Sequence, residues 1–322
     1  MNIELLSANL TNPALLFFIL GIISVQFKSD LEIPKNSAKF ISLYLLFAIG
    51  FKGGQELAHS TISSSVFASV MFGVFLAVAI PVYSFFILKR KLSVENAGAI
   101  AAAYGSVSAV TFVTAVAFLE MQGVKFGGHM VAVMAFMEAP AIIVGVILIR
   151  IFSRDLNKHE HTSFKGILKH ALTNGSVLLI MGSLFIGFVT SEEQAQGMAP
   201  FTTDLFKGFL AIFLLDMGIE SGKRLKAFMQ EGWFTTSFAV VVALINGCMI
   251  ALLSGFVVDA VGDRFMFAVL GASASYIAVP AAMKIAVPNA NPGLYIPMAL
   301  AVTFPVNITL GLPIYFFIAQ TF

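Results

Sequence analysis

The chain carries very little charge for its length. Only 11% of its 322 residues are Asp, Glu, Lys or Arg, about half the share that is usual in soluble domains. Hydrophobic residues make up 58%, and the mean hydropathy is +0.92. The formal net charge of +2 gives no basis for binding nucleic acid, because proteins that bind it are strongly basic. The composition excludes a soluble globular protein and indicates an integral membrane protein.

Cysteine is nearly absent as well. Cys248 is the single one and lies in an apolar run, which excludes a disulfide framework and a thiolate metal site. The sequence also contains no phosphate-binding loop, no recognisable pair of nucleophile and base, and no spacing typical of metal ligands. We therefore expect neither an enzyme nor a resident cofactor.

Arginine is scarce, and the positions of the arginines narrow the kinds of ligand. They lie at the ends of apolar segments or between them, at Arg90, Arg150, Arg154, Arg224 and Arg264. We therefore expect no arginine fork inside the membrane that could clamp a dicarboxylate or a phosphate. A small anion held by backbone N–H groups and hydroxyls fits this composition better.

The sequence does contain a long series of apolar runs. Most are near the ~20 residues that an α-helix needs to cross a bilayer, whereas barrel strands would be about half as long. The second and the seventh run are short for full spans. We expect an all-α polytopic membrane protein with ten transmembrane helices, at residues 13–27, 38–50, 66–88, 97–119, 129–152, 174–190, 205–218, 233–258, 264–286 and 293–322.

Basic residues are unevenly divided between the two faces that ten spans create. Of the 19 lysines and arginines, all but Lys52, Lys125, Lys207 and Arg264 fall on one face. The positive-inside rule places that face in the cytoplasm. We therefore expect a multi-pass protein of the cell inner (plasma) membrane with both termini outside and the loop 150–173 in the cytoplasm.

The two halves of the chain share motifs in the same order. Residues 50–54, 105–115 and 137–140 parallel residues 218–222, 271–281 and 302–305, at offsets of 165–168 residues. Each half holds five spans, an odd number, so the second half must be inverted in the membrane. We predict a first five-helix repeat at 1–152, a cytoplasmic linker at 153–173 and a second, inverted repeat at 174–322. Inverted repeats with interrupted helices at matching positions are typical of secondary transporters.

The fourth and ninth spans carry small and hydroxyl-bearing residues at matching positions. Residues 104–115 read YGSVSAVTFVTA, and residues 270–282 read LGASASYIAVPAA. Glycine loosens a helix and proline removes an N–H donor, and each freed backbone group inside a membrane needs a partner. We predict that helices 4 and 9 are interrupted there and face each other around a small solute; the alternative is that the small residues only allow close helix packing. The predicted substrate-binding residues are Gly105, Ser106, Ser108, Gly271, Ser273, Ser275 and Tyr276.

A single carboxylate, Glu138, lies near the middle of the fifth span. A charged side chain at the bilayer centre costs about 2.5–3.5 kcal/mol on insertion scales, so it should face protein, water or an ion. Thr303 occupies the matching position of the second half, and Asn307 follows it. Oxygen ligands of this kind suit a hard cation such as sodium. We predict that Thr111, Glu138, Thr303 and Asn307 couple transport to a cation, the alternative being a protonated, structural Glu138.

These motifs resemble those of the SbtA-type sodium-dependent bicarbonate transporter family. Residues 272–282 (ASASYIAVPAA), 288–292 (PNANP), 303–307 (TFPVN) and 311–313 (GLP) are similar to its second-half motifs. Residues 213–218 (FLLDMG) resemble its seventh span, and 104–108 (YGSVS) its first-half site. The resemblance implies a gate domain and a mobile core domain, a homotrimer, and uptake of bicarbonate driven by sodium through an elevator-type movement. It also implies that Ser108, Thr111 and Ser273 lie about the anion and sodium sites.

The sequence departs from this family pattern at three places. Ala274-Ser275 stands where well-known cyanobacterial members have Asn-Asp, Ala109-Val110 stands where they have Gly-Ser, and Glu138 replaces an Asp. The first two changes remove oxygen ligands that sodium would use, whereas Glu138 keeps a carboxylate and is the milder change. Two alternatives therefore stay open: a transporter of another small monoanion, such as a short monocarboxylate, coupled to protons through Glu138, and a non-transporting membrane sensor. Some members bind a PII-like regulatory protein, and the short loop 150–173 argues against that partner here.

Overall fold

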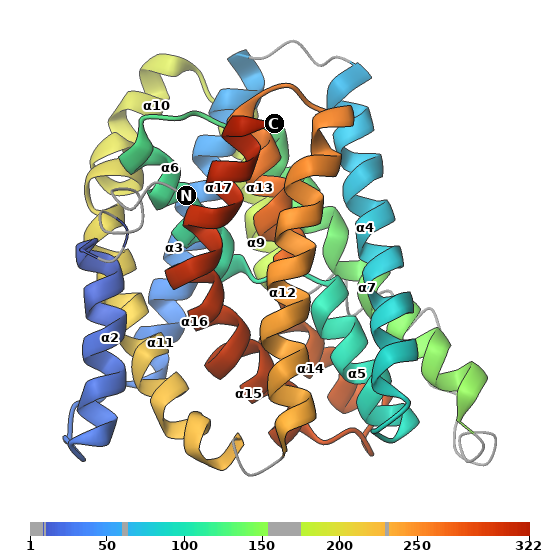
Figure 1. The fold of residues 1–322 in the computed structure, drawn as a ribbon. Coiled ribbons are helices and arrows are strands. Elements are labelled where there is room, and N and C mark those ends of the chain that lie inside the picture. Colours follow the sequence, from blue (N-terminus) through green and yellow to red (C-terminus); the bar gives the residue numbers. More distant parts are fainter. Residues whose placement is uncertain (1–8, 10, 60–63, 154–174, 229–231) are drawn as a thin grey trace.

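The computed structural model describes residues 9, 11–59, 64–153, 175–228 and 232–322, and its regular secondary structure over this part of the chain is entirely helical (Figure 1). Of the predicted linker 153–173, only Ser153 lies within the described residues, so the loop and any regulatory partner bound to it fall outside them. The helices of the first half are α2 (Pro13–Gln26), α3 (Lys35–His59), α4 (Ser64–Leu88), α5 (Val94–Gly105), α6 (Ala109–Gln122) and α7 (His129–Phe152).

The second half is also helical but less regular. It contains π-helical turns and a short helix, α10, that begins with a capping box formed by Ser191 and Gln194. Its elements are α9 (Gly175–Val189), α10 (Glu192–Ala199), η2 (Pro200–Asp204), α11 (Phe206–Phe228), α12 (Trp233–Leu253), η4 (Ser254–Phe256), α13 (Val261–Ala272), α14 (Ala278–Ala286), α15 (Pro292–Pro297), η5 (Met298–Thr303), α16 (Phe304–Val306), η6 (Asn307–Gly311) and α17 (Leu312–Thr321).

Six helical stretches among the described residues are long and apolar enough to cross a membrane. They are 64–88, 94–122, 129–152, 192–225, 233–256 and 292–321, while α2 and α9 are apolar but shorter. The chain is thus a multi-pass membrane protein. All ten predicted spans fall on helical segments, but ten crossings in two inverted repeats remain a prediction.

The second and seventh predicted spans are longer than the sequence suggested. Instead of 38–50 and 205–218, the helices run from Lys35 to His59 and from Phe206 to Phe228. Polar residues such as Lys52 and Glu56 end an apolar run, but they do not end a helix, because lysine and glutamate are good helix formers. Hydropathy therefore found the apolar core of each helix and missed its ends.

Both predicted interruptions are present in the structure. The fourth predicted span is split into α5 and α6, and the ninth into α13 and α14, each with a short non-helical segment in between. The last predicted span behaves differently at Pro305. There the chain stays helical and absorbs the missing N–H donor through the π-helical segments η5 and η6 on either side.

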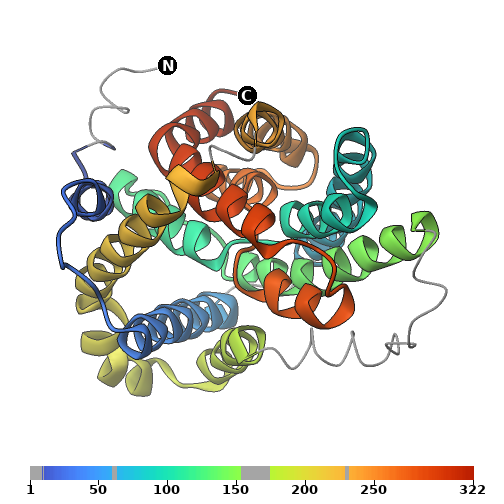
Figure 2. The ribbon, with the colours of Figure 1, turned by 90° about the horizontal axis from the view of Figure 1, so that it is seen from below.

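Two groups of helices lie side by side, as the view in Figure 2 shows. In the first, which we call the glycine-packed group, α2 packs on α11 and α3 packs on α9. Gly21 meets the backbone of Gly218, and Gly54 meets that of Gly187, so these helices approach too closely for larger side chains. In the second, the break group, α4, α5 and α7 pack together and α12 packs on α13 and α17. The remaining half-helices of the breaks belong to this group as well, since α6 packs on α13 and α14 packs on α5 and α7. Each group combines helices from both halves of the chain.

Candidate functional site

The first break is built from two serines that end one helix and begin the next. The backbone N–H of Ser106 closes α5 by donating to the carbonyl of Ala102, at 3.0 Å. The hydroxyl of Ser108 accepts from the N–H of Thr111, at 3.2 Å, and so forms the N-cap of α6. Serine suits the start of α6 because its short side chain satisfies an N–H group that a helix start leaves unpaired.

The second break repeats this arrangement. Ser273 ends α13, with its N–H donating to the carbonyl of Val269 at 3.0 Å and its hydroxyl to that of Leu270 at 2.9 Å. The hydroxyl of Ser275 accepts from the N–H of Val279 in the first turn of α14, at 3.4 Å. All four serines of the two breaks are at most 4% exposed. Each break therefore places a helix N-terminus, with its partial positive charge, inside the protein.

The two breaks are joined directly by hydrogen bonds. The N–H of Ser275 donates to the carbonyl of Ala103, at 2.8 Å. The N–H of Ser108 donates to the hydroxyl of Ser273, at 3.0 Å. The predicted meeting of the fourth and ninth spans is thus present, and both halves of the chain contribute to one site.

A small cavity of about 30 Å³ lies beside the joined breaks, room for about two water molecules. Ser108, Ser275 and Tyr276 line it from the breaks, and Glu138 lines it from α7. A neighbouring cavity of similar size also borders Glu138. Glu138 forms no hydrogen bond or ion pair with any other described residue, so its carboxyl group is available to an ion, a proton or water.

Ser106 contributes a second polar group without a partner. Its side chain is fully buried, and its hydroxyl finds no hydrogen-bond partner within the described part of the chain. A buried polar group without a partner costs about 1–3 kcal/mol, which makes it a candidate contact for a bound solute or water. Gly105, its neighbour, packs against the ring of Pro81, and Gly271 packs against Ile250. These two glycines fix the distance between each break and the helix beside it.

The structure does not place Thr303 and Asn307 on this cavity. The hydroxyl of Thr303 donates to the carbonyl of Ala239, at 3.1 Å, and lies 2.6 Å from the hydroxyl of Tyr104. The amide of Asn307 donates to the carbonyl of Ala272, at 2.9 Å. Thr111 is buried with its N–H capped by Ser108, and it does not border the cavity either. Tyr276 does border it, and its hydroxyl donates to the sulfur of Met217 at 3.4 Å.

Two cavity residues escaped the sequence analysis. Ser42 on α3 and Ser176 on α9 line the cavity from the glycine-packed group, opposite the breaks. Ser42 stands among apolar residues without glycine or proline nearby, and Ser176 follows Asn174 and Gly175 at the start of an apolar run, where a serine is ordinary, so the sequence offers only a weak signal. A repeated search for single hydroxyls inside apolar runs could have found them, at the cost of many packing serines such as Ser69, which is buried in α4.

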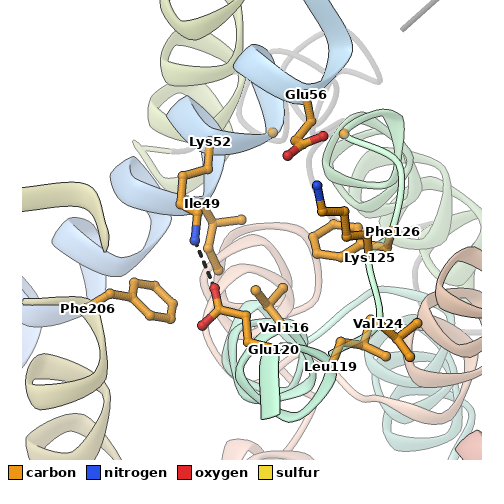
Figure 3. Close-up of a pocket in the computed structure, with 12 residues that line it drawn as sticks. Ile49, Lys52, Glu56, Val116, Leu119, Glu120, Val124, Lys125, Phe126 and Phe206 are labelled. Atoms are coloured by element: carbon orange, nitrogen blue, oxygen red, sulfur yellow. Dashed lines mark hydrogen bonds and ion pairs between the residues drawn. The ribbon is translucent and has the colours of Figure 1, made fainter. Parts of the chain in front are cut away.

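A larger cavity, of about 210 Å³, lies elsewhere (Figure 3). Lys52 and Glu56 of α3 and Glu120 of α6 border it together with Lys125, and Phe206 of α11 closes one side. The ammonium of Lys52 is 2.8 Å from a carboxylate oxygen of Glu120. Its charges are balanced and partly exposed, and the hydrogen-bonded breaks of the two halves do not border it. We therefore place the candidate site at the breaks and regard this cavity as a gap between the two helix groups.

Arg264 is buried, which the sequence analysis did not expect. Its guanidinium donates to the carbonyl of Ala251, at 3.1 Å, and only 8% of its surface is exposed. The neighbouring Asp263 accepts from the N–H of Gly127, at 2.6 Å. Both residues hold the first turn of α13 rather than its broken end.

Comparison with known proteins identifies the family. A search among curated proteins finds no match. The family model described as the Na⁺-dependent bicarbonate transporter superfamily matches residues 13–320, nearly the whole chain. The match includes both breaks, Glu138 and all helices described above. With its broken helices joined at one buried site, this chain belongs to the Na⁺-dependent bicarbonate transporter superfamily.

Proposed function

We propose that this protein imports bicarbonate together with sodium, as a symporter of the inner membrane. One observation carries the proposal: helix breaks from the two halves of the chain are hydrogen-bonded to each other beside a cavity lined by hydroxyls and a carboxyl group. Membership of a family of bicarbonate transporters supports the choice of substrate.

The anion would be held by hydroxyls and helix N-termini. Ser106, Ser108, Ser273, Ser275 and Tyr276 supply the polar groups of the proposed substrate site, and Gly105 and Gly271 keep its walls close. Bicarbonate has three oxygens that accept such hydrogen bonds and one O–H that donates. The cavity of about 30 Å³ must widen to admit it, which fits a site that changes shape during transport.

The cation would lie between Glu138 and the first break. Glu138 and Thr111 are the residues we propose for coupling, because a carboxylate and a hydroxyl are hard oxygen ligands. Thr303 and Asn307 could join them only if their hydrogen bonds to the carbonyls of Ala239 and Ala272 broke. The carboxyl group of Glu138, with no described partner, also favours the second candidate function, which is proton-coupled transport of another small monoanion.

The movement we propose is of the elevator type. The break group, which carries Ser108, Ser275 and Glu138, would slide against the glycine-packed group, whose close backbone contacts suit a fixed gate domain. Ser42 and Ser176 face the site from the proposed gate domain, and they would lose contact with the site during this movement. We further propose ten spans in two inverted repeats, 1–152 and 174–322, a homotrimer, and both termini outside the cell.

Transport by purified protein tests this proposal. In proteoliposomes, labelled bicarbonate should enter faster with an inward sodium gradient than with potassium in its place. Ser108→Ala and Ser273→Ala should each raise the KM for bicarbonate by roughly 2–10-fold, the equivalent of one hydrogen bond. Ser69→Ala, which removes a buried hydroxyl of α4 away from the site, is the matched control and should leave the KM unchanged.

The outcomes separate the candidate functions. Uptake of bicarbonate that ignores sodium but follows a pH gradient would favour proton coupling. Uptake of a short monocarboxylate in preference to bicarbonate would favour the other anion. Binding without any flux would leave a membrane sensor.

A further inference from the structure

The second break has a feature that the first lacks: two asparagines cover the end of its first half-helix. The side-chain amide of Asn246, on α12, donates to the carbonyl of Gly271 at 3.2 Å. That of Asn307, in η6, donates to the carbonyl of Ala272 at 2.9 Å. These are the last two carbonyls of α13, and no further turn of helix follows to supply N–H donors. They form the negative end of the helix dipole.

Each asparagine is held by a tyrosine on another part of the fold. The hydroxyl of Tyr83 donates to the side-chain oxygen of Asn246 at 2.6 Å. That of Tyr315 lies 2.8 Å from the side-chain oxygen of Asn307 and 3.1 Å from the carbonyl of Ala243, so its one hydrogen is shared between these two acceptors, with the shorter contact to Asn307. The orientation of both amides is fixed by chemistry, because a backbone carbonyl accepts only and must face the NH₂ group. The result is two parallel relays that run from tyrosine to asparagine to carbonyl.

Among the described residues, no side-chain amide covers the first break in this way. The sequence offset of 166 residues that relates Gly105 to Gly271 relates Asn246 to Ile80 and Asn307 to Ala141, both apolar. The described hydrogen bond to the end of α5 from outside it is the main-chain bond from Ser275 to Ala103. Near the same end lies the hydroxyl of Ser106, which has no partner among the described residues. The two breaks thus match in backbone and differ in charge distribution.

We infer that Asn246 and Asn307, held by Tyr83 and Tyr315, are positioning residues that make the second break selective for the anion. This inference rests on the proposed anion transport. An anion between the two halves of a broken helix is attracted by the N–H groups of the second half and repelled by the carbonyls of the first. Two amide N–H groups that occupy the carbonyls of Gly271 and Ala272 reduce this repulsion. At the first break the carbonyl end keeps its negative potential and favours the cation.

The test uses substitutions that keep the shape of the side chain. Asn246→Asp and Asn307→Asp replace a donor by an acceptor. Each change makes the potential at the end of α13 more negative, which disfavours an anion at the second break. Tyr83→Phe and Tyr315→Phe release the amides without adding charge. Asn12→Asp is the control, because Asn12 caps α2 through its side-chain oxygen, which aspartate retains.

We expect the Asp variants to raise the KM for the transported anion at least about tenfold, the effect of replacing a favourable contact by an unfavourable one. The Phe variants should raise it about two- to fivefold, and kcat and the sodium concentration for half-maximal rate should stay within about twofold. Thermal stability in detergent is measured alongside, and if the Asp variants do not fold, the Phe variants decide the question. The inference is overturned if folded variants lose kcat or stability while the KM is unchanged.

Transport by the wild-type protein distinguishes a failure of this inference from a failure of the proposed function. If wild type carries bicarbonate and the variants keep its KM, only the inference fails. If wild type carries another monoanion instead, the same KM comparison is made with that anion. If wild type carries no anion, the proposed function fails, and the inference fails with it.

Discussion

Glu138 and Ser106 are the polar side chains near the two breaks that have no described partner, and of the two only Glu138 carries a carboxyl group. Ser108, Ser273 and Ser275 are engaged in caps and cross-links, and Thr303 and Asn307 are engaged with backbone carbonyls. Residue type alone pointed correctly to where polar groups gather, because hydroxyls and carboxylates inside an apolar run are costly and need a reason. It could not tell which oxygen would be occupied, because the carbonyl that each side chain meets belongs to a different helix.

Glu138→Gln tests the role of that carboxyl group. The amide keeps the size of the side chain but removes the charge and the titrating proton. If Glu138 binds the coupling cation, the sodium concentration for half-maximal uptake should rise about 10–100-fold, since a charged contact is worth about 1.5–3 kcal/mol. Glu56→Gln is the control, because Glu56 borders the other cavity. Sodium dependence identical to wild type in Glu138→Gln would assign Glu138 to structure.

At the scale of the helices, the sequence predicted where two helices break but not where helices end or which helices face each other. Glycine, serine and proline marked the breaks at residues 106–108 and 273–277, because they leave backbone groups unpaired inside a membrane. The same reasoning missed the ends of α3 and α11, where polar residues continue a helix beyond its apolar core. It also missed Ser42 and Ser176, whose part in the site depends on which helix faces the breaks, a question that only packing settles.

Gly271→Ala tests whether close packing at a break holds the site in shape. A Cβ at this position would collide with the side chain of Ile250, while the same change at Gly182, on α9, meets nothing within 4 Å. We expect Gly271→Ala to lower transport and thermal stability, at a cost of roughly 1–3 kcal/mol from overpacking. Gly182→Ala should be neutral. The double variant Gly271→Ala with Ile250→Val should recover part of the loss, and failure to recover any would mean that the glycine is needed for another reason.

At the scale of the whole molecule, the two groups of helices meet through side chains of very different kinds. Around the breaks the contact is small and hydroxyl-rich. Near the cavity of about 210 Å³ the contact is charged, with Lys52 and Glu120 facing each other across the two groups. A partly exposed pair of this kind is worth only about 0–1 kcal/mol. Such a contact can be broken and remade at little cost, which suits two bodies that slide past one another.

The proposed orientation in the membrane can be tested by labelling single cysteines. In a Cys248→Ala background, Lys125→Cys should react in intact cells with a thiol reagent that does not cross membranes. Arg90→Cys, an exposed position at the end of α4 on the face we assign to the cytoplasm, should react only after the cells are permeabilised. The reverse pattern would invert the topology, and labelling of both sites in intact cells would contradict the proposed number of crossings between them.

The bond from the Ser275 N–H to the Ala103 carbonyl has a consequence for how the protein could be divided. It is made entirely by main-chain atoms, so only an exchange of Ser275 for proline, which has no N–H, would delete it directly. Its two ends are supplied by opposite halves of the gene. Neither half expressed alone would possess a complete recognition centre. Two co-expressed fragments, cut within residues 154–174, would form a complete recognition centre only by reassociating. The affinity of that reassociation would measure how strongly the two breaks bind each other.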